Sequence, residues 1–115
     1  MRVLLNEQLP RQLSAYLVGH EVRTVQQQRW AGTKNGEPLR LAVEARFESF
    51  LTADHNLEYQ QNLQEVSLGI SVLVAASNAL EDLLPLVPDT LEALSAIQPG
   101  QLVRVLGTRA TSDDA

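Results

Sequence analysis

The strongest constraint on the fold is the segment 68–74, LGISVLV, which is almost entirely apolar and contains three β-branched residues. Such a run is typical of a strand buried on both faces, as in the middle of a parallel sheet. Shorter apolar or alternating runs predict four more strands, at 2–5, 20–25, 47–52 and 101–106. Apolar residues at helical spacing predict helices between them, at 10–17, 36–46, 78–84 and 87–97. This alternation predicts an α/β fold with a central, mostly parallel sheet and helices on both faces.

The bulk properties of the chain indicate one soluble domain. Its 115 residues are 44% hydrophobic, enough for a single core. The sequence contains no cysteine, which excludes disulfides, thiolate catalysis and sulfur-based zinc sites. No apolar run approaches the roughly 20 residues that span a bilayer, and the first residues do not form a signal peptide. We therefore expect a cytoplasmic domain over 1–106, with a disordered tail at 107–115.

Charge is unevenly distributed along the sequence. The net charge is -5, yet residues 1–50 carry seven of the nine basic side chains, while residues 51–103 carry seven acids and no Lys or Arg. Because nucleic-acid affinity comes mainly from neutralising phosphates, a pI near 4.9 argues against strong nonspecific binding by the whole surface. A local basic patch in the first half stays open, as does an ordinary mixed surface.

Acidic and amide residues follow two of the predicted strands and open the helix between them. Asn6 and Glu7 follow the first strand, Asp54 follows the third, and Asn35 and Glu37 stand at the start of the second helix. In a parallel sheet these groups lie at the edge formed by the strand carboxyl ends, where open α/β sheets bind ligands. Carboxylates there predict a site for Mg²⁺ or Mn²⁺. Solvated loop acids, and helix-capping roles for Asn35 and Glu37, are the alternatives.

Four basic residues flank these positions in sequence and could contact a phosphate backbone: Arg11, Arg29, Lys34 and Arg40. Of these, Arg11, Lys34 and Arg40 are the candidates for binding RNA. A solvent-facing place on a helix is the alternative for Arg11 and Arg40. The sequence contains neither a Gly-rich phosphate loop nor a dinucleotide fingerprint. No serine lies in a Gly-x-Ser-x-Gly elbow. These absences favour a metal-dependent site over Ser-His-Asp catalysis or dinucleotide binding.

Several segments in order resemble the short PIN-like domain family of bacterial and archaeal proteins, which includes VapC-like toxins and domains of unknown function. They are VLLNEQLPRQL, GHEVRTV, the loop with Trp30 and Gly32, KNGEPLRLA, FLTADHNLEYQQNL and LEDLLPLVP. The match covers about residues 1–105. The resemblance implies a PIN-like three-layer α/β/α sandwich and a Mg²⁺- or Mn²⁺-dependent ribonuclease site. It also implies a toxin–antitoxin pair in which a small antitoxin protein blocks that site, and a possible homodimer.

The resemblance can be carried over position by position. It implies Glu7, Glu37 and Asp54 as the catalytic carboxylates, and Asn6, Glu7 and Asp54 as the metal ligands. Many members have Asp where this chain has Asn6, and acidic positions also fall on Asn35 and Asn56. Each such amide removes one negative charge, and a hard divalent cation then loses both Coulomb attraction and a preferred ligand.

Three functions are consistent with these features of the sequence. The first is a metal-dependent endoribonuclease, the toxin-like member of a toxin–antitoxin pair, with weakened catalysis. The second is a catalytically degenerate PIN-like module that binds RNA or a protein partner without cleavage. The third is a structural subunit that dimerises through the leucine-rich run LEDLLPLVPDTLEAL, although packing of this run on its own sheet explains the leucines equally.

Overall fold

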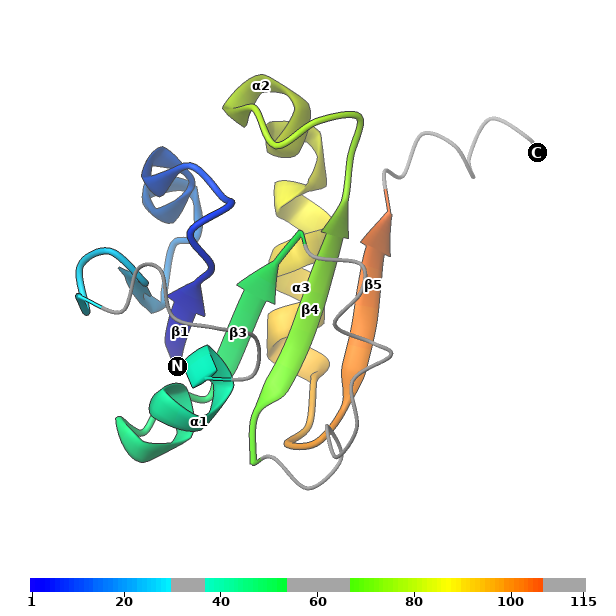
Figure 1. Cartoon of the computed structure of the whole chain (residues 1–115). Coiled ribbons are helices and arrows are strands. Elements are labelled where there is room, and N and C mark those ends of the chain that lie inside the picture. Colours follow the sequence, from blue (N-terminus) through cyan, green and yellow to red (C-terminus); the bar gives the residue numbers. More distant parts are fainter. Residues whose placement is uncertain (30–36, 54–66, 107–115) are drawn as a thin grey trace.

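The computed structural model of the chain describes residues 1–29, 37–53 and 67–106. Five short strands are present in these segments: β1 Arg2–Leu5, β2 Glu21–Thr24, β3 Ser49–Thr52, β4 Gly69–Val74 and β5 Leu102–Leu106. They form one sheet in the order β2-β1-β3-β4-β5, and every neighbouring pair is parallel (Figure 1). The predicted strands and the parallel α/β architecture are confirmed, with strand bounds shifted by one or two residues.

In the same described segments, three α-helices and two 3-10 helices connect the strands. Their bounds are η1 Arg11–Tyr16, α1 Glu37–Glu44, α2 Leu80–Leu83, η4 Leu84–Leu86 and α3 Val87–Ala96. The helix predicted after Pro10 is a 3-10 helix, which begins with a tight bond from the Leu13 N–H to the Pro10 carbonyl. The helices predicted at 78–84 and 87–97 are not separated by a break at Pro85. The chain continues from α2 through η4 into α3, because Pro85 and Pro88 stand in the first turns of η4 and α3, where a missing N–H costs nothing.

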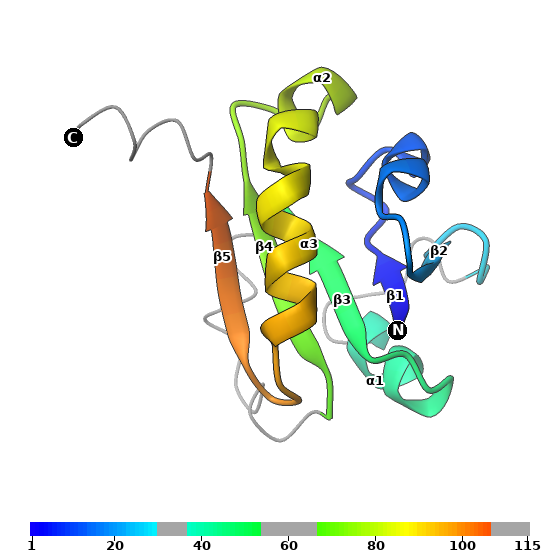
Figure 2. The ribbon, with the colours of Figure 1, turned by 180° about the vertical axis from the view of Figure 1, so that it is seen from behind.

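The helices pack against both faces of the sheet, as Figures 1 and 2 show from opposite sides. On one face, η1, α2 and α3 cover a cluster that includes Val3, Leu51 and Leu94. On the other face, Ala42 of α1 belongs to a second cluster with Leu4 and several neighbours from β3 and β4. Successive residues of a strand point to opposite faces, so β1 supplies both clusters. The central strand β4 is buried along most of its length, as its apolar sequence predicts.

Small residues of β4 let α3 approach the sheet closely. A Cβ atom added to Gly69 would lie 2.9 Å from Cγ2 of Ile97, the residue that ends α3. Ser71, two positions along the same face, is fully buried, and its hydroxyl has no hydrogen-bond partner in the described part of the chain. This contact therefore depends on side-chain size rather than on polar pairing.

The amino ends of β1 and β2 carry a separate polar cluster. Arg2 donates to Glu21 at 2.8 Å, and its guanidinium lies 4.4 Å from the ring centroid of Phe47. Nδ1 of His20 lies 3.4 Å from the N-terminal nitrogen of Met1. Partial burial and the positive charge of that amino group lower the pKa of His20 below its ordinary value, although Glu48 acts in the opposite direction.

The strand order determines where a ligand can bind. The chain leaves β1 toward β2 on one side, and β3 then pairs on the other side of β1. The reversal makes the gap between the carboxyl ends of β1 and β3 the switch point of the sheet, the usual ligand crevice in this class of fold. Within the described residues, no helix is long and apolar enough to cross a membrane.

Candidate functional site

Asn6 is positioned by the sheet itself. Its N–H donates to the Leu51 carbonyl of β3 at 2.9 Å, which continues the pairing of β1 and β3 one residue beyond the strand. On the other side of β1, the Val25 N–H donates to the Leu5 carbonyl at 3.0 Å. The residues after β1, β2 and β3 are thus held side by side at the carboxyl edge, as the sequence predicts for Asn6 and Glu7.

The side chain of Asn6 joins β1 to β3 at the switch point. Its Nδ2 donates to Oγ1 of Thr52 at 2.9 Å and to Oε1 of Gln8 at 3.2 Å, while its Oδ1 accepts the Glu7 N–H at 2.8 Å. Oε1 of Gln8 also accepts from the Thr52 hydroxyl at 3.2 Å and from the Ala53 N–H at 3.3 Å. The nitrogen end of the Asn6 amide therefore links the two strands, while its oxygen end makes a local bond to the next residue.

This arrangement uses a property that an aspartate lacks. An ionised carboxylate only accepts hydrogen bonds, whereas an amide donates through its NH₂ group as well. Asn6 directs its oxygen to the Glu7 N–H and its nitrogen to Thr52. Its role as a neutral metal ligand stays a prediction. Glu7 itself is exposed beside this network.

The predicted metal site is only partly within the described residues. Asp54 lies outside them, and so does the side chain of Glu37, although the backbone of Glu37 begins α1. Across residues 1–29, 37–53 and 67–106, no three His, Asp or Glu side chains gather in a way that could hold a metal ion. A Mg²⁺ or Mn²⁺ site built from Glu7, Glu37 and Asp54 therefore stays a prediction.

A hollow of about 530 Å³, lined by both polar and apolar atoms, opens beside the switch point. It is bordered by the residues that follow β1, by the turn after β2 and by one residue from the loop after β4: Glu7, Gln8, Leu9, Pro10, Arg11, Thr24, Gln26, Gln27 and Asn78. The turn after β2 is held by a reciprocal pair of bonds, since Thr24 N–H donates to Oε1 of Gln27 at 2.8 Å and Gln27 N–H donates to Oγ1 of Thr24 at 3.0 Å.

Four amide side chains of this hollow were missed by sequence reasoning: Gln8, Gln26, Gln27 and Asn78. In the sequence they read as loop or helix-start residues, and they come from three separate connections. Only the adjacency of β2 to β1, together with the path from β4 to α2, brings them together. A run of glutamines after a predicted strand was the one signal available beforehand.

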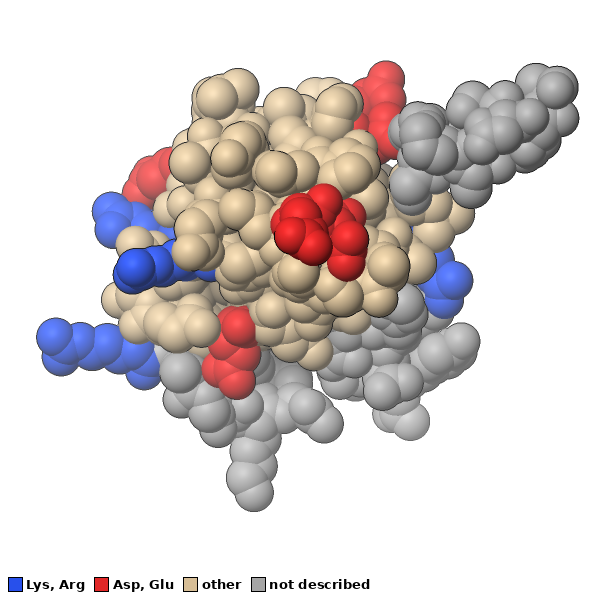
Figure 3. All heavy atoms as spheres, turned by 90° about the horizontal axis from the view of Figure 1, so that it is seen from above, with Lys and Arg blue, Asp and Glu red and all other residues tan. Residues whose placement is uncertain are grey.

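The three predicted RNA contacts are placed differently. Arg11 borders the hollow. Arg40 lies on an exposed side of α1 and pairs with Glu44 at 2.9 Å, away from the hollow. Lys34 is outside the described residues. Figure 3 views the molecule from the side to which the strands point, and most of its basic side chains project where β1, β2 and η1 lie. The exposed residues Arg11, Arg23 and Arg29 belong to that part of the chain.

Comparisons with protein-family models, curated proteins and solved structures found no match to this chain.

Proposed function

We propose that the chain is a PIN-like α/β protein, with the three-layer arrangement of that family, that binds single-stranded RNA at its carboxyl-edge hollow with little or no cleavage. The observation that carries this proposal is the hydrogen bonding of Asn6, which donates to Thr52 and Gln8 and accepts from Glu7. The position at which a PIN-like nuclease has a metal-binding carboxylate is here a structural amide.

Loss of this carboxylate weakens hydrolysis for a physical reason. Cleavage of a phosphodiester by a metal site requires an ion that activates water and offsets the developing negative charge. Mg²⁺ is bound chiefly through carboxylates and substrate phosphate oxygens, so an amide in place of an aspartate lowers affinity for the ion.

The hollow has the size and chemistry to accept a nucleotide. Its volume lies within the common range for small-molecule sites. Proteins that read single-stranded RNA hydrogen-bond the exposed edges of unstacked bases, and amide side chains both donate and accept such bonds. Arg11 at the border supplies a positive charge for a phosphate. The overall charge of -5 limits affinity elsewhere on the surface, which favours a local contact over nonspecific binding.

A metal-dependent endoribonuclease is the second candidate, because Glu7 is exposed at the border of the hollow. Combined with Glu37 and Asp54, it would leave three carboxylates for Mg²⁺ or Mn²⁺, in a toxin-like protein controlled by a small antitoxin partner. This candidate and the first share the same edge of the sheet and differ in whether RNA is cut.

The binding test uses fluorescein-labelled RNA 12-mers of each single base, titrated with protein and followed by fluorescence anisotropy at low salt. Arg11→Gln and Arg40→Gln form a matched pair, since each removes one positive charge from an exposed arginine. We expect Arg11→Gln to weaken binding by roughly tenfold and Arg40→Gln by roughly twofold or less. Equal effects of the two variants would contradict binding at the hollow.

The cleavage test incubates the same RNAs with the wild type and with Glu7→Gln in the presence of millimolar Mn²⁺. We expect no cleavage above the metal-only control for either protein. Cleavage by the wild type that disappears in Glu7→Gln would establish the nuclease and overturn the noncatalytic proposal, whatever the binding result.

A further inference from the structure

We propose that the carboxyl-edge hollow prefers RNA bases with a lactam group, a ring C=O next to a ring N–H, over bases with an amino group at the same place. Uracil, guanine and hypoxanthine belong to the first class, and cytosine and adenine belong to the second. This preference rests on the proposed RNA binding and names the class of base that the site takes. The residues that set it are Gln8 and Gln27, whose amides are oriented as hydrogen-bond donors.

The Gln27 amide is oriented by the backbone of its own turn. Its Oε1 accepts the Thr24 N–H at 2.8 Å, while the Gln27 N–H donates to Oγ1 of Thr24 at 3.0 Å. A backbone N–H can only donate, so the end of the amide that faces it is the oxygen. The NH₂ group of Gln27 therefore lies on the other side of the amide, and this exposed residue borders the hollow.

The Gln8 amide is oriented in the same way. Its Oε1 accepts from the Ala53 N–H at 3.3 Å, from the Thr52 hydroxyl at 3.2 Å and from Nδ2 of Asn6 at 3.2 Å. Within the described part of the chain, Nε2 of Gln8 and Nε2 of Gln27 make no hydrogen bond. The hollow is thus bordered by two amides whose oxygens are used by the protein and whose NH₂ groups are left for a ligand.

Two such donors select for oxygen on the base. Uracil carries an oxygen at C4 where cytosine carries an amino group, and guanine and hypoxanthine carry an oxygen at C6 where adenine carries an amino group. The oxygen can accept from an amide NH₂, whereas an amino group brings donor against donor and leaves hydrogen bonds unmade. The neighbouring ring N–H of a lactam base can donate to Gln26 or Asn78, which also border the hollow and whose amides can present an oxygen.

A phosphate oxygen is the other acceptor that RNA could bring to these donors. Glu7 borders the same hollow, and its carboxylate disfavours a second anion there, whereas a base oxygen is uncharged. Arg11, also at the border, supplies a positive charge for the backbone. We therefore assign the base to the two glutamines and the phosphate to Arg11.

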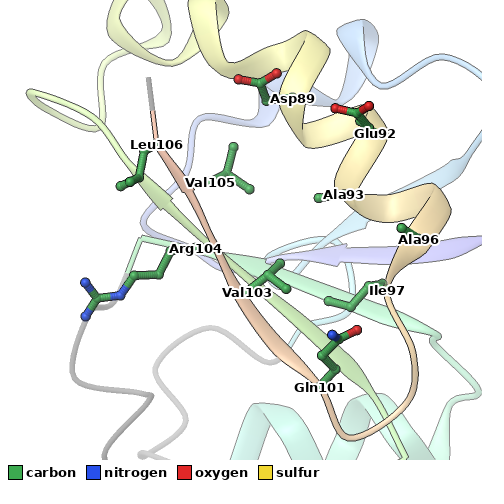
Figure 4. A pocket seen from close by; sticks show the side chains of 10 residues that line it. All are labelled: Asp89, Glu92, Ala93, Ala96, Ile97, Gln101, Val103, Arg104, Val105 and Leu106. Atoms are coloured by element: carbon green, nitrogen blue, oxygen red, sulfur yellow. The ribbon is translucent and has the colours of Figure 1, made fainter. Parts of the chain in front are cut away.

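A hollow of about 360 Å³ between β5 and α3 offers a comparison within the same protein (Figure 4). Gln101, at its border, is oriented like Gln27, since its Oε1 accepts the Gln98 N–H at 3.0 Å. Gln101 directly precedes β5 and so lies at the amino edge of the sheet, away from the carboxyl-edge hollow. Asp89 and Glu92 stand at the border of this second hollow, and their charges repel a phosphate backbone. Gln101 is therefore a matched control for Gln27.

The ligand side of the test compares fluorescein-labelled U and C 12-mers by anisotropy against the full chain at neutral pH and low salt. A second pair consists of C 12-mers with one central inosine or one central adenosine. Each pair exchanges a lactam for an amino group on the same ring. We expect the U 12-mer to bind at least roughly fivefold more tightly than the C 12-mer, and inosine to raise affinity where adenosine does not.

The protein side of the test compares Gln27→Glu with Gln101→Glu and Gln26→Glu. Gln27→Glu keeps an oxygen for the Thr24 N–H and replaces the NH₂ group by a second oxygen. The added charge weakens binding of both RNAs, so the measured quantity is the ratio of their affinities, in which a uniform charge effect cancels. We expect the preference for U over C to fall to roughly twofold or less in Gln27→Glu. Gln101→Glu adds the same charge away from the hollow and Gln26→Glu adds it at the hollow, and both should keep the wild-type ratio.

The outcomes separate the base preference from RNA binding itself. Equal binding of the U and C 12-mers that is still weakened by Arg11→Gln would overturn the preference and leave RNA binding at the hollow in place. Absence of binding by every 12-mer would overturn both. A U-over-C ratio that is unchanged in Gln27→Glu, or that falls equally in Gln27→Glu and Gln101→Glu, would overturn the assignment of the preference to the oriented glutamine.

Discussion

Replacing Asn6 by aspartate would separate the structural use of this position from metal binding. The wild-type amide donates to Oγ1 of Thr52 at 2.9 Å and to Oε1 of Gln8 at 3.2 Å. An aspartate cannot make either donation when it is ionised. The Thr52 hydroxyl can rotate to donate to the new carboxylate, but Oε1 of Gln8 is then left facing a negative charge.

The expected cost can be worked from these contacts. A neutral hydrogen bond contributes roughly 0.5–1.5 kcal/mol net, and an acceptor left facing another acceptor adds a further penalty. The bond from the Glu7 N–H to Oδ1, at 2.8 Å, becomes charge-assisted in Asn6→Asp and offsets part of the loss. We therefore expect Asn6→Asp to lower the free energy of unfolding by about 1 kcal/mol at neutral pH, without a change of fold.

The assay is urea unfolding followed by circular dichroism, with and without Mn²⁺. A metal that binds only the folded state adds about 1.4 kcal/mol at ten times its Kd. We expect Mn²⁺ to restore the stability of Asn6→Asp while leaving the wild type unchanged. Asn6→Ala is the control, because it removes the same donor without adding a carboxylate, and it should show no response to Mn²⁺.

Two results would refute this reasoning. Stabilisation of the wild type by Mn²⁺ that is lost in Asn6→Ala would mean that the native amide is itself a metal ligand. A metal-free Asn6→Asp variant more stable than the wild type would mean that the bonds to Thr52 and Gln8 contribute nothing. The double variant Asn6→Asp with Glu7→Gln tests whether Glu7 is a second ligand of the Mn²⁺ bound by Asn6→Asp. If it is, the double variant should no longer be stabilised by Mn²⁺.

Three further predictions concern the fold. Gly69→Ala should destabilise the protein by roughly 1–3 kcal/mol in urea unfolding, since the added Cβ meets Ile97 at 2.9 Å. The same substitution should cost less in an Ile97→Ala background, which is itself destabilised by the loss of a buried side chain. Ser71→Ala should leave stability unchanged or raise it by up to about 1 kcal/mol in the same assay, because it removes a buried hydroxyl that has no partner among the described residues. The pKa of His20 in the folded protein lies below its ordinary value of 6.5, so the unfolded chain binds more protons near that pH. The free energy of unfolding should therefore fall as the pH drops below about 6.5. His20→Gln should reduce this dependence in unfolding curves measured from pH 7.5 to 5.5.

The strands were predictable from sequence because their signal is local. The apolar run 68–74 is too short for a core helix, which favours a strand buried on both faces. The alternation of polar and apolar residues in 20–25 indicates a strand without knowledge of the strands beside it. The type and continuity of the helices were harder to predict from the sequence. Whether the residues after Pro10 form an α-helix or a 3-10 helix depends on how Leu13 and Leu17 reach the core. The continuity of α2 with α3 depends on where each proline falls within a turn.

The site was predictable to the extent that it depends on strand ends. Asn6 and Glu7 were placed at the carboxyl edge because they directly follow a strand, and the structure confirms that placement. Gln26 and Asn78 could not be added beforehand, since they reach the same hollow only through a strand order that the sequence does not state. The role of Asn6 as a donor was hidden as well, because the partner hydroxyl on Thr52 is 46 positions away.

The charge at position 6 also bears on RNA binding in the absence of metal. A carboxylate about 6 Å from a phosphate repels it by roughly 1–3 kcal/mol, depending on the local dielectric, and salt reduces this further. An amide at position 6 adds no repulsion to that of Glu7, which borders the hollow, so on our proposal the wild type is expected to bind RNA without a bridging ion. We expect Asn6→Asp to bind the RNA 12-mers roughly fivefold more weakly in EDTA and to regain affinity in Mn²⁺, as measured by anisotropy, whereas the wild type should be insensitive to the metal. Unchanged RNA affinity of Asn6→Asp in EDTA would place the phosphate away from the switch point and would contradict binding at this hollow.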